Sequence, residues 1–179
     1  NKILEIYGRY REQVRQKNSR DSDGTVTELE DVLQCNYRLN ISYAISEFFT
    51  IKSRLEYVTI NRPSNTPEKG MILTQDILFK PKNLPFDLSL RYALFDTDSY
   101  DSRLYTYENN ALYVFAVPAY YYQGSRFYAL VRYSFLRHCD LWVRYGVFKY
   151  NNRTSIGSGA EEIKGSVKTD VTLQLRIKF

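Results

Sequence analysis

Residues Lys168–Phe179 read KTDVTLQLRIKF, and this stretch does most to decide the fold class of the chain. Apolar side chains occupy every second position in it: Val171, Leu173, Leu175, Ile177 and Phe179. Because successive side chains of a strand point to opposite faces, the alternation predicts a β-strand with one apolar and one polar face. Such strands are typical of transmembrane β-barrels, which are apolar toward lipid and polar toward the lumen. A half-buried strand of a soluble β-sandwich is the alternative that this stretch alone leaves open.

The same five apolar residues resemble the C-terminal signal that outer-membrane barrels present to the barrel-assembly machinery. The stretch departs from the usual form of that signal, because Gln174 stands where a glycine is often found. The resemblance implies a location in the outer membrane of a Gram-negative bacterium. The expected partners are then outer-membrane lipid, the assembly machinery and other envelope proteins.

The composition is compatible with a β-rich membrane domain. The 179 residues include 17 Tyr, 10 Phe and one Trp, which fits the aromatic girdles of barrels and also the cross-strand pairs of any large sheet. The mean hydropathy of −0.45 does not argue against a barrel, because only alternate strand residues face lipid. No run of about 18 apolar residues occurs, so no transmembrane helix is expected. The net charge of +5 is spread along the strands, so charge alone does not indicate nucleic acid.

Alternating patterns separated by turn signals predict further strands along the chain. Before the C-terminal stretch we place them at residues 2–16, 31–45, 48–60, 71–80, 86–96, 126–135 and 140–150. Polar loops are expected between them at residues 18–28, 61–70, 96–102 and 151–163. Residues Arg103–Tyr122 allow one long strand or two short ones. Two strands keep the short turns on one side and the long loops on the other, as in bacterial barrels, and bring the total to about ten.

The predicted fold class is therefore all-β, an antiparallel transmembrane β-barrel formed by residues 1–179 as one domain. The about ten strands make up either a whole barrel or part of a larger one. The chain starts at Asn1 without an initiator methionine or a signal peptide, although export through the inner membrane requires such a signal. We therefore expect a mature or truncated product, the C-terminal part of a longer protein.

Several motifs in the second half of the chain point to one family of envelope proteins. In order, they are Ala93–Tyr100 (ALFDTDSY), Tyr107–Asn109 (YEN), Val117–Tyr121 (VPAYY), Gly124–Arg126 (GSR) and Ile156–Gly159 (IGSG) with Glu162. Together they resemble the C-terminal barrel region of Bacteroidota-type outer-membrane proteins that are labelled by an N-terminal helix-hairpin-helix module. The resemblance implies an outer-membrane location and a longer parent protein. The module itself, a DNA-backbone binder in other proteins, is absent from these residues, so its activity is carried over to no position here.

The polar faces of the predicted strands carry more cations than acids. The cations expected to project into the lumen are Arg38, Lys52, Arg54, Arg91, Arg132, Arg144, Lys168 and Arg176. In a small barrel such side chains would pair with acids and fill the interior, whereas in a wider one they would line a water-filled path that favours anions. Glu108 falls within an otherwise aromatic stretch. We expect it to be a buried acid paired with a lumenal arginine rather than a catalytic group.

Few residues offer reactive chemistry. His138 is the only histidine and adjoins Cys139 in a predicted tight turn, where adjacent residues rarely form a nucleophile–base pair. Cys35 lies on the predicted lipid face, far from Cys139 in the expected topology, so no disulfide is predicted. A zinc site would need more histidine and cysteine ligands. We therefore expect no catalytic residue, no metal and no cofactor.

These patterns predict a non-enzymatic integral outer-membrane β-barrel. One hypothesis is a pore or translocation unit whose basic lumen selects anions. Another is a plugged barrel that serves as a membrane-anchored subunit of an envelope complex. DNA binding or uptake is the alternative, and it depends on the module that these residues lack.

Overall fold

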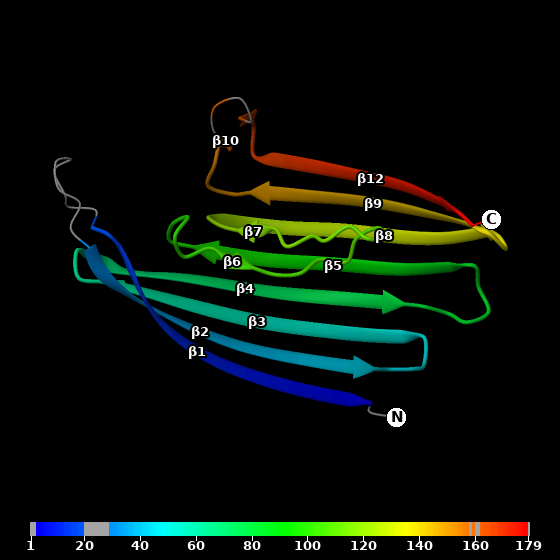
Figure 1. Cartoon of the computed structure of the whole chain (residues 1–179), viewed down its shortest axis with the longest axis horizontal. Helices are drawn as coiled ribbons and strands as arrows, with labels where there is room; N and C mark the ends of the chain where they lie inside the picture. Colours follow the sequence, from blue (N-terminus) through cyan, green and yellow to red (C-terminus); the bar gives the residue numbers. More distant parts are fainter. Residues whose placement is uncertain (1–2, 20–28, 158, 160–161, 179) are drawn as a thin grey trace.

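The computed structural model describes residues 3–19, 29–157, 159 and 162–178. They form an all-β domain with almost no helix. Eight long strands build one antiparallel sheet, and two further ribbons of two short strands each do not pair with it (Figure 1). No helix among the described residues has the length and apolarity needed to cross a membrane.

The long strands follow the order β1-β2-β3-β4-β5-β8-β9-β12 across the sheet. Their bounds are β1 Leu4–Asn18, β2 Leu29–Ala44, β3 Phe49–Arg62, β4 Asn65–Phe79, β5 Phe86–Thr97, β8 Gln123–Leu136, β9 Cys139–Tyr150 and β12 Val167–Ile177. Each of the long alternating patterns in the sequence is confirmed as a strand. The two small ribbons pair β6 Leu104–Tyr105 with β7 Ala119–Tyr120, and β10 Ser155–Ile156 with β11 Ile163–Lys164.

The predicted loop at residues 61–70 is wrong. β3 runs to Arg62 and β4 begins at Asn65, so only a tight turn separates the two strands. Pro63 lies in that turn, where its fixed φ and missing N–H are tolerated. The alternation continues on both sides of the turn, and as a result Arg62 and Glu68 are both buried on the same face of the sheet.

The stretch Arg103–Tyr122 contributes no strand to the main sheet, and the predicted total of about ten strands falls to the observed eight. β5 pairs directly with β8, while β6 and β7 pair only with each other. The physical reason is burial: Leu104, Glu108 and Tyr120 turn toward the sheet and are at most 2% exposed. The chain leaves β5 and enters β8 at the same end of the sheet. A segment that does not cross the sheet therefore keeps the short turns on one side and the long loops on the other, as two strands would also have done.

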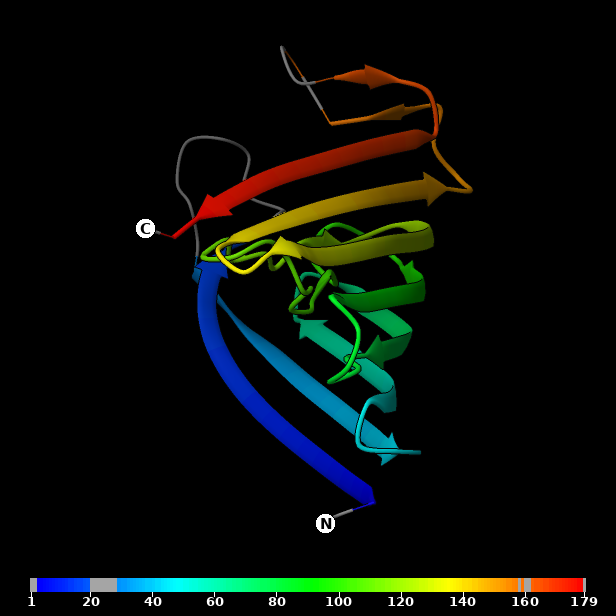
Figure 2. The ribbon, with the colours of Figure 1, turned by 90° about the vertical axis from the view of Figure 1, so that its right-hand side faces the viewer.

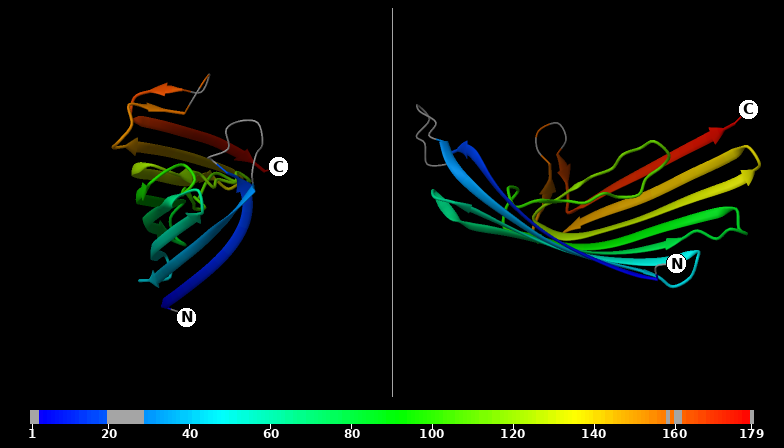
Figure 3. Two further views of the ribbon diagram at one scale, coloured as in Figure 1. Left: turned by 90° about the vertical axis from the view of Figure 1, so that its left-hand side faces the viewer. Right: turned by 60° about the horizontal axis from the view of Figure 1, so that its bottom comes forward.

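The sheet is strongly curved, and residues 98–122 lie on its concave side (Figure 2). We call these residues the inner segment. The trough-like curvature is also visible from below the sheet (Figure 3). β1 and β12 form the two edges and do not pair with each other, so the described strands do not close into a barrel.

The convex face of the sheet is apolar and exposed. Large apolar side chains on this face include Ile6, Tyr37, Leu39, Leu55, Leu73, Tyr92, Leu94, Phe127, Tyr133, Val143, Tyr145, Leu173 and Leu175. Aromatic rings meet near the two ends of this face, with ring centroids 6.4 Å apart for Phe49 and Phe79 and 6.3 Å apart for Tyr37 and Tyr57. Along β3 the distance from Phe49 to Tyr57 is about 27 Å at ~3.4 Å per residue.

The concave face has two apolar clusters with charged residues between them. The first cluster packs Phe95 of the sheet against Leu104 and Tyr120 of the inner segment, with ring centroids of Phe95 and Tyr120 5.4 Å apart. The second packs Ala111 of the inner segment against Trp142 of β9. The inner segment is therefore packed against the sheet at both clusters, and the charges between the clusters are shielded from solvent.

Candidate functional site

The charged residues of the sheet gather on the concave face. Cross-strand register places all eight cations predicted to face the lumen on this one face: Arg38, Lys52, Arg54, Arg91, Arg132, Arg144, Lys168 and Arg176. Lys52 and Lys168 are exposed, and each of the six arginines contacts a carboxylate.

The most deeply buried charges meet at Glu108, whose side chain is 1% exposed. Arg126 donates to both oxygens of Glu108, from Nε at 3.1 Å and from Nη2 at 3.0 Å, and Arg144 contacts the same carboxylate. The Tyr120 hydroxyl donates a further hydrogen bond to Glu108 at 2.6 Å. Asp170 of β12 accepts a hydrogen bond from Arg126 at 2.7 Å and contacts Arg144. Two carboxylates and two guanidinium groups thus form a charge-neutral network that joins three strands to the inner segment.

Burial raises the pKa of the Tyr120 hydroxyl above its ordinary value, and the neighbouring Glu108 carboxylate raises it further. The hydroxyl therefore stays protonated and serves as a hydrogen-bond donor to that carboxylate.

A second group of arginines holds the middle of the inner segment. Arg91 donates to the Tyr107 carbonyl oxygen at 2.6 Å and to Asp76 at 2.7 Å. Arg54 donates to the Thr106 hydroxyl at 3.0 Å. Guanidinium groups from β3, β5, β8 and β9 therefore converge on the short stretch around Glu108, which fixes the inner segment to the sheet.

Gly146 of β9 makes room for the network. A Cβ at this position would lie 2.6 Å from Nη2 of Arg126 and 2.7 Å from Oδ2 of Asp170. A larger residue would have to displace the ion pair that these two side chains form.

A third set of charges lies near the short turns. Arg132 and Arg176 both donate to Asp140, at 3.1 Å and 3.0 Å, and Arg132 also donates to Asp87 at 3.2 Å. Both guanidinium groups also lie within 6 Å of the Trp142 ring centroid, at 5.6 Å and 5.2 Å. These interactions engage both arginines with carboxylates on the concave face.

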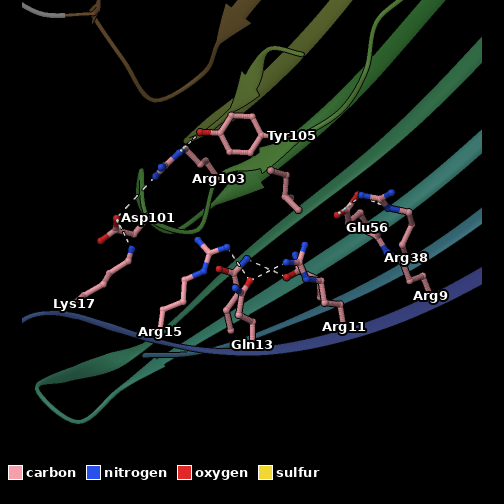
Figure 4. Close-up of a pocket in the computed structure, with 13 residues that line it drawn as sticks. Arg9, Arg11, Gln13, Arg15, Lys17, Arg38, Glu56, Asp101, Arg103 and Tyr105 are labelled. Carbon is pink, nitrogen blue, oxygen red and sulfur yellow. Dashed lines mark hydrogen bonds and ion pairs between the residues drawn. The ribbon is translucent and has the colours of Figure 1, made fainter. Parts of the chain in front are cut away.

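The inner segment does not cover the concave face evenly. A pocket of about 260 Å³ opens beside it, over β1 and β2 (Figure 4). We call it the basic pocket, and its lining is Arg9, Arg11, Gln13, Arg15, Lys17, Gln34, Asn36, Arg38, Glu56, Asp101, Arg103, Leu104 and Tyr105. Six of these residues are cations and two are acids, so the lining carries an excess of positive charge.

Arg9, Arg11 and Arg15 of β1 make no ion pair with a carboxylate of the described residues, whereas Lys17 lies 4.0 Å from Asp101. Arg11 and Arg15 donate to the same Gln13 amide oxygen, at 3.0 Å and 2.8 Å, and neither contacts a carboxylate in the part of the chain that the structure describes. Arg9 lies directly opposite Arg38 in the β1–β2 ladder. Like charges in direct cross-strand register repel each other; Glu56 compensates Arg38, but no carboxylate of the described residues contacts Arg9.

Sequence reasoning missed Arg126 and the β1 cations of the basic pocket. The signal for Arg126 was present, because it alternates in phase with Arg132, which was assigned to the lumen. Arg9 and Arg11 likewise fall opposite the apolar set of the first strand. No sequence signal indicated that the inner segment would pair one group of arginines and leave the β1 group uncovered.

The predicted assembly-signal residues Val171, Leu173, Leu175 and Ile177 all lie on the convex face and are exposed, whereas Phe179 lies outside the described residues. Cys35 and Cys139 are free thiols. His138 lies in the turn before Cys139. In the described ranges, no group of three or more His, Cys, Asp or Glu residues is arranged to hold a metal ion.

Comparisons with family models, with curated proteins and with solved structures find no match to this chain. The similarity to Bacteroidota outer-membrane proteins therefore stays a prediction. Most of its motifs lie in β5, the inner segment and β8, whereas the last begins at Ile156 in β10. These motifs include three members of the network: Glu108, Tyr120 and Arg126.

Proposed function

We propose that this chain forms part of the wall of an integral outer-membrane β-barrel and acts as a non-enzymatic pore or translocation unit for anions. The observation that carries the proposal is the inverted distribution of polarity. The convex face is mostly apolar and exposed, whereas most of the charged residues lie on the concave face. In water such a face would expose a large apolar surface to solvent, whereas in a bilayer it would contact lipid.

The dimensions of the apolar face support this assignment. The row of convex-face residues from Phe49 to Tyr57 in β3 spans about 27 Å. Tilted by about 40°, as barrel strands are, it rises about 21 Å, close to the ~25 Å apolar band of outer-membrane barrels. Aromatic rings lie near both ends of the row, as expected of interfacial girdles. Ser53 is the polar residue in this row, and its hydroxyl donates a hydrogen bond to the side chain of Gln75 in β4 at 2.7 Å.

The complete barrel must have more than the eight strands seen here. A closed barrel of about eight strands has an interior that side chains alone fill, and it has no room for an added backbone. The inner segment is such a backbone. Unpaired strand edges are also not tolerated in lipid. We infer that further strands pair with β1 and β12, and that the inner segment partly plugs the lumen of the larger barrel.

The uncovered strip along β1 and β2 is then the path for solutes. Its arginines would favour anions, because the acids on this part of the face are already engaged. A membrane-anchored structural subunit is the second candidate, and the firmly held inner segment favours it. The two candidates differ in whether current passes through the barrel.

The proposal is tested by ion conductance of the full-length parent protein in planar bilayers under a salt gradient. We expect a reversal potential that indicates anion selectivity. Arg11→Glu combined with Arg15→Glu should shift it toward cations, whereas Arg137→Glu, at an exposed turn, should not. Absence of conductance would overturn the pore and leave the anchor, and unchanged selectivity in the double variant would overturn the assigned path.

A further inference from the structure

We propose that the basic pocket is a binding site for a phosphate-bearing anion. Its location inside a lumen rests on the proposed function, but the site itself is argued from the described residues. The pocket volume of about 260 Å³ lies just below the ~300–1,000 Å³ typical of sites for drug-sized molecules. It therefore suits a compact charged group.

The charge of the pocket is not balanced from within. Glu56 is shared between Arg38, at 2.9 Å, and Arg54. Asp101 is engaged by Arg62, whose Nη2 lies 2.6 Å from Oδ2. Asp101 also lies 4.0 Å from Lys17 and 3.9 Å from Arg103, so both acids of the lining are shared among several cations, and Arg9, Arg11 and Arg15 remain as surplus positive charge.

Two details of Arg9 favour the binding of an anion beside it. Arg9 faces Arg38 across the ladder, and its Nε is buried without a hydrogen-bond partner in the described part of the chain. An unsatisfied buried donor on a charged group is costly, and an acceptor bound beside the Arg9 and Arg38 side chains on the concave face would satisfy it. The same acceptor would relieve the repulsion between the two guanidinium groups.

The residue types select phosphate over a single carboxylate. Guanidinium groups bind planar pairs of oxygens on carboxylates and phosphates alike. A carboxylate supplies one negative charge, whereas a phosphate monoester supplies about 1.5 to 2 and three acceptor oxygens. Arg11 and Arg15 flank Gln13 and extend from one strand on the same side (Figure 4), so a tetrahedral group can accept from both.

Titration calorimetry of the full-length protein in detergent, with inorganic pyrophosphate as the probe, tests the site. We expect saturable binding that weakens as salt is raised. Arg11→Gln combined with Arg15→Gln should weaken binding by about tenfold or more, because charge-assisted hydrogen bonds are lost. Arg137→Gln combined with Lys149→Gln removes the same charge from exposed positions off the concave face and should change nothing. Thermal unfolding of each variant reports whether it is folded.

No saturable binding by the wild type, or equal weakening by the control pair, would overturn the site. Anion-selective conductance without pyrophosphate binding would leave the pore standing and remove the site. Pyrophosphate binding without conductance would leave the site standing and remove the pore.

The phosphate could belong to a soluble compound or to a lipid head group, and competition distinguishes them. Nanodiscs containing lipid A that displace pyrophosphate, with loss of this effect in the Arg11/Arg15 variant, would assign the head group. Full pyrophosphate binding in their presence would assign a soluble ligand. An oligonucleotide that binds far more tightly than pyrophosphate through the same two arginines would overturn the compact ligand and indicate nucleic acid.

Discussion

The covered and uncovered parts of the concave face use arginine in opposite ways. Beneath the inner segment, Arg126 and Arg144 have side chains at most 4% exposed and share two carboxylates. On β1, Arg11 and Arg15 are exposed and share one amide oxygen. The difference lies in the partner, since the covered arginines meet Glu108 of the inner segment, whereas no carboxylate of the described residues contacts Arg11 or Arg15. The first group stabilises the fold, and the second leaves positive charge available to a ligand.

Removal of the central acid should have the largest effect. Glu108→Gln leaves two buried guanidinium groups with a single shared carboxylate, and the loss of one member of a buried pair costs about 3–5 kcal/mol of unfolding free energy. Urea unfolding in detergent micelles measures it. Glu47→Gln breaks the fully exposed pair with Lys82 and should leave the unfolding midpoint unchanged. Equal effects of the two changes would show that the network is not the stabilising feature.

Crowding the network should have the next largest effect. Gly146→Ala pushes a methyl group against Arg126 and Asp170, and we expect a loss of about 1–3 kcal/mol in the same unfolding measurement. Gly8→Ala is the matched control, because no atom lies within 4 Å of a Cβ built there. A neutral result at Gly146 would mean that the two side chains move apart freely.

Removal of the hydroxyl donor should have an effect of similar size. Tyr120→Phe deletes the hydrogen bond to Glu108 while keeping the packed ring, so we expect about 1.5–3 kcal/mol at most. Tyr113→Phe, at a side chain that is 94% exposed, should be silent. Stability equal to wild type after Tyr120→Phe would indicate that water replaces the hydroxyl.

Substitution on the uncovered strand should have the smallest effect on stability. Arg15→Gln removes no ion pair among the described residues, and the unfolding free energy should change by no more than about 0.5 kcal/mol. A loss comparable to that of Glu108→Gln would erase the distinction between the two groups of arginines.

Much of the sheet could be predicted from the sequence, because alternation along each strand is a local signal. The run from Leu33 to Tyr43 gave β2 and the face of Cys35 directly, and the phase of Arg132 and Arg144 put both on one face. The prolines at positions 63 and 67 suggested a loop where a two-residue turn suffices.

The inner segment could not be predicted in the same way. Its residues are fixed by contacts with strands that are distant in sequence, and Glu108 gains its arginine partners only when β8 and β9 are assembled. Its aromatic residues look like those of strands, because burial against a sheet selects apolar side chains whether or not the backbone is extended. Arg11 and Arg15 of β1 stay exposed because the inner segment does not extend over them, and no local sequence pattern encodes where that segment lies on the sheet.

The most direct measurement of the central claim is the accessibility of a nitroxide spin label on the two faces of the sheet, in the native full-length protein in bilayers. Single cysteines would replace Leu173 on the convex face and Arg15 on the concave face, in a background where Cys35 and Cys139 are serine. A lipid-facing wall predicts that the label at 173 relaxes with oxygen and not with a water-soluble nickel chelate, and that the label at 15 does the opposite. High nickel accessibility at 173 would place the convex face in water and contradict the membrane wall.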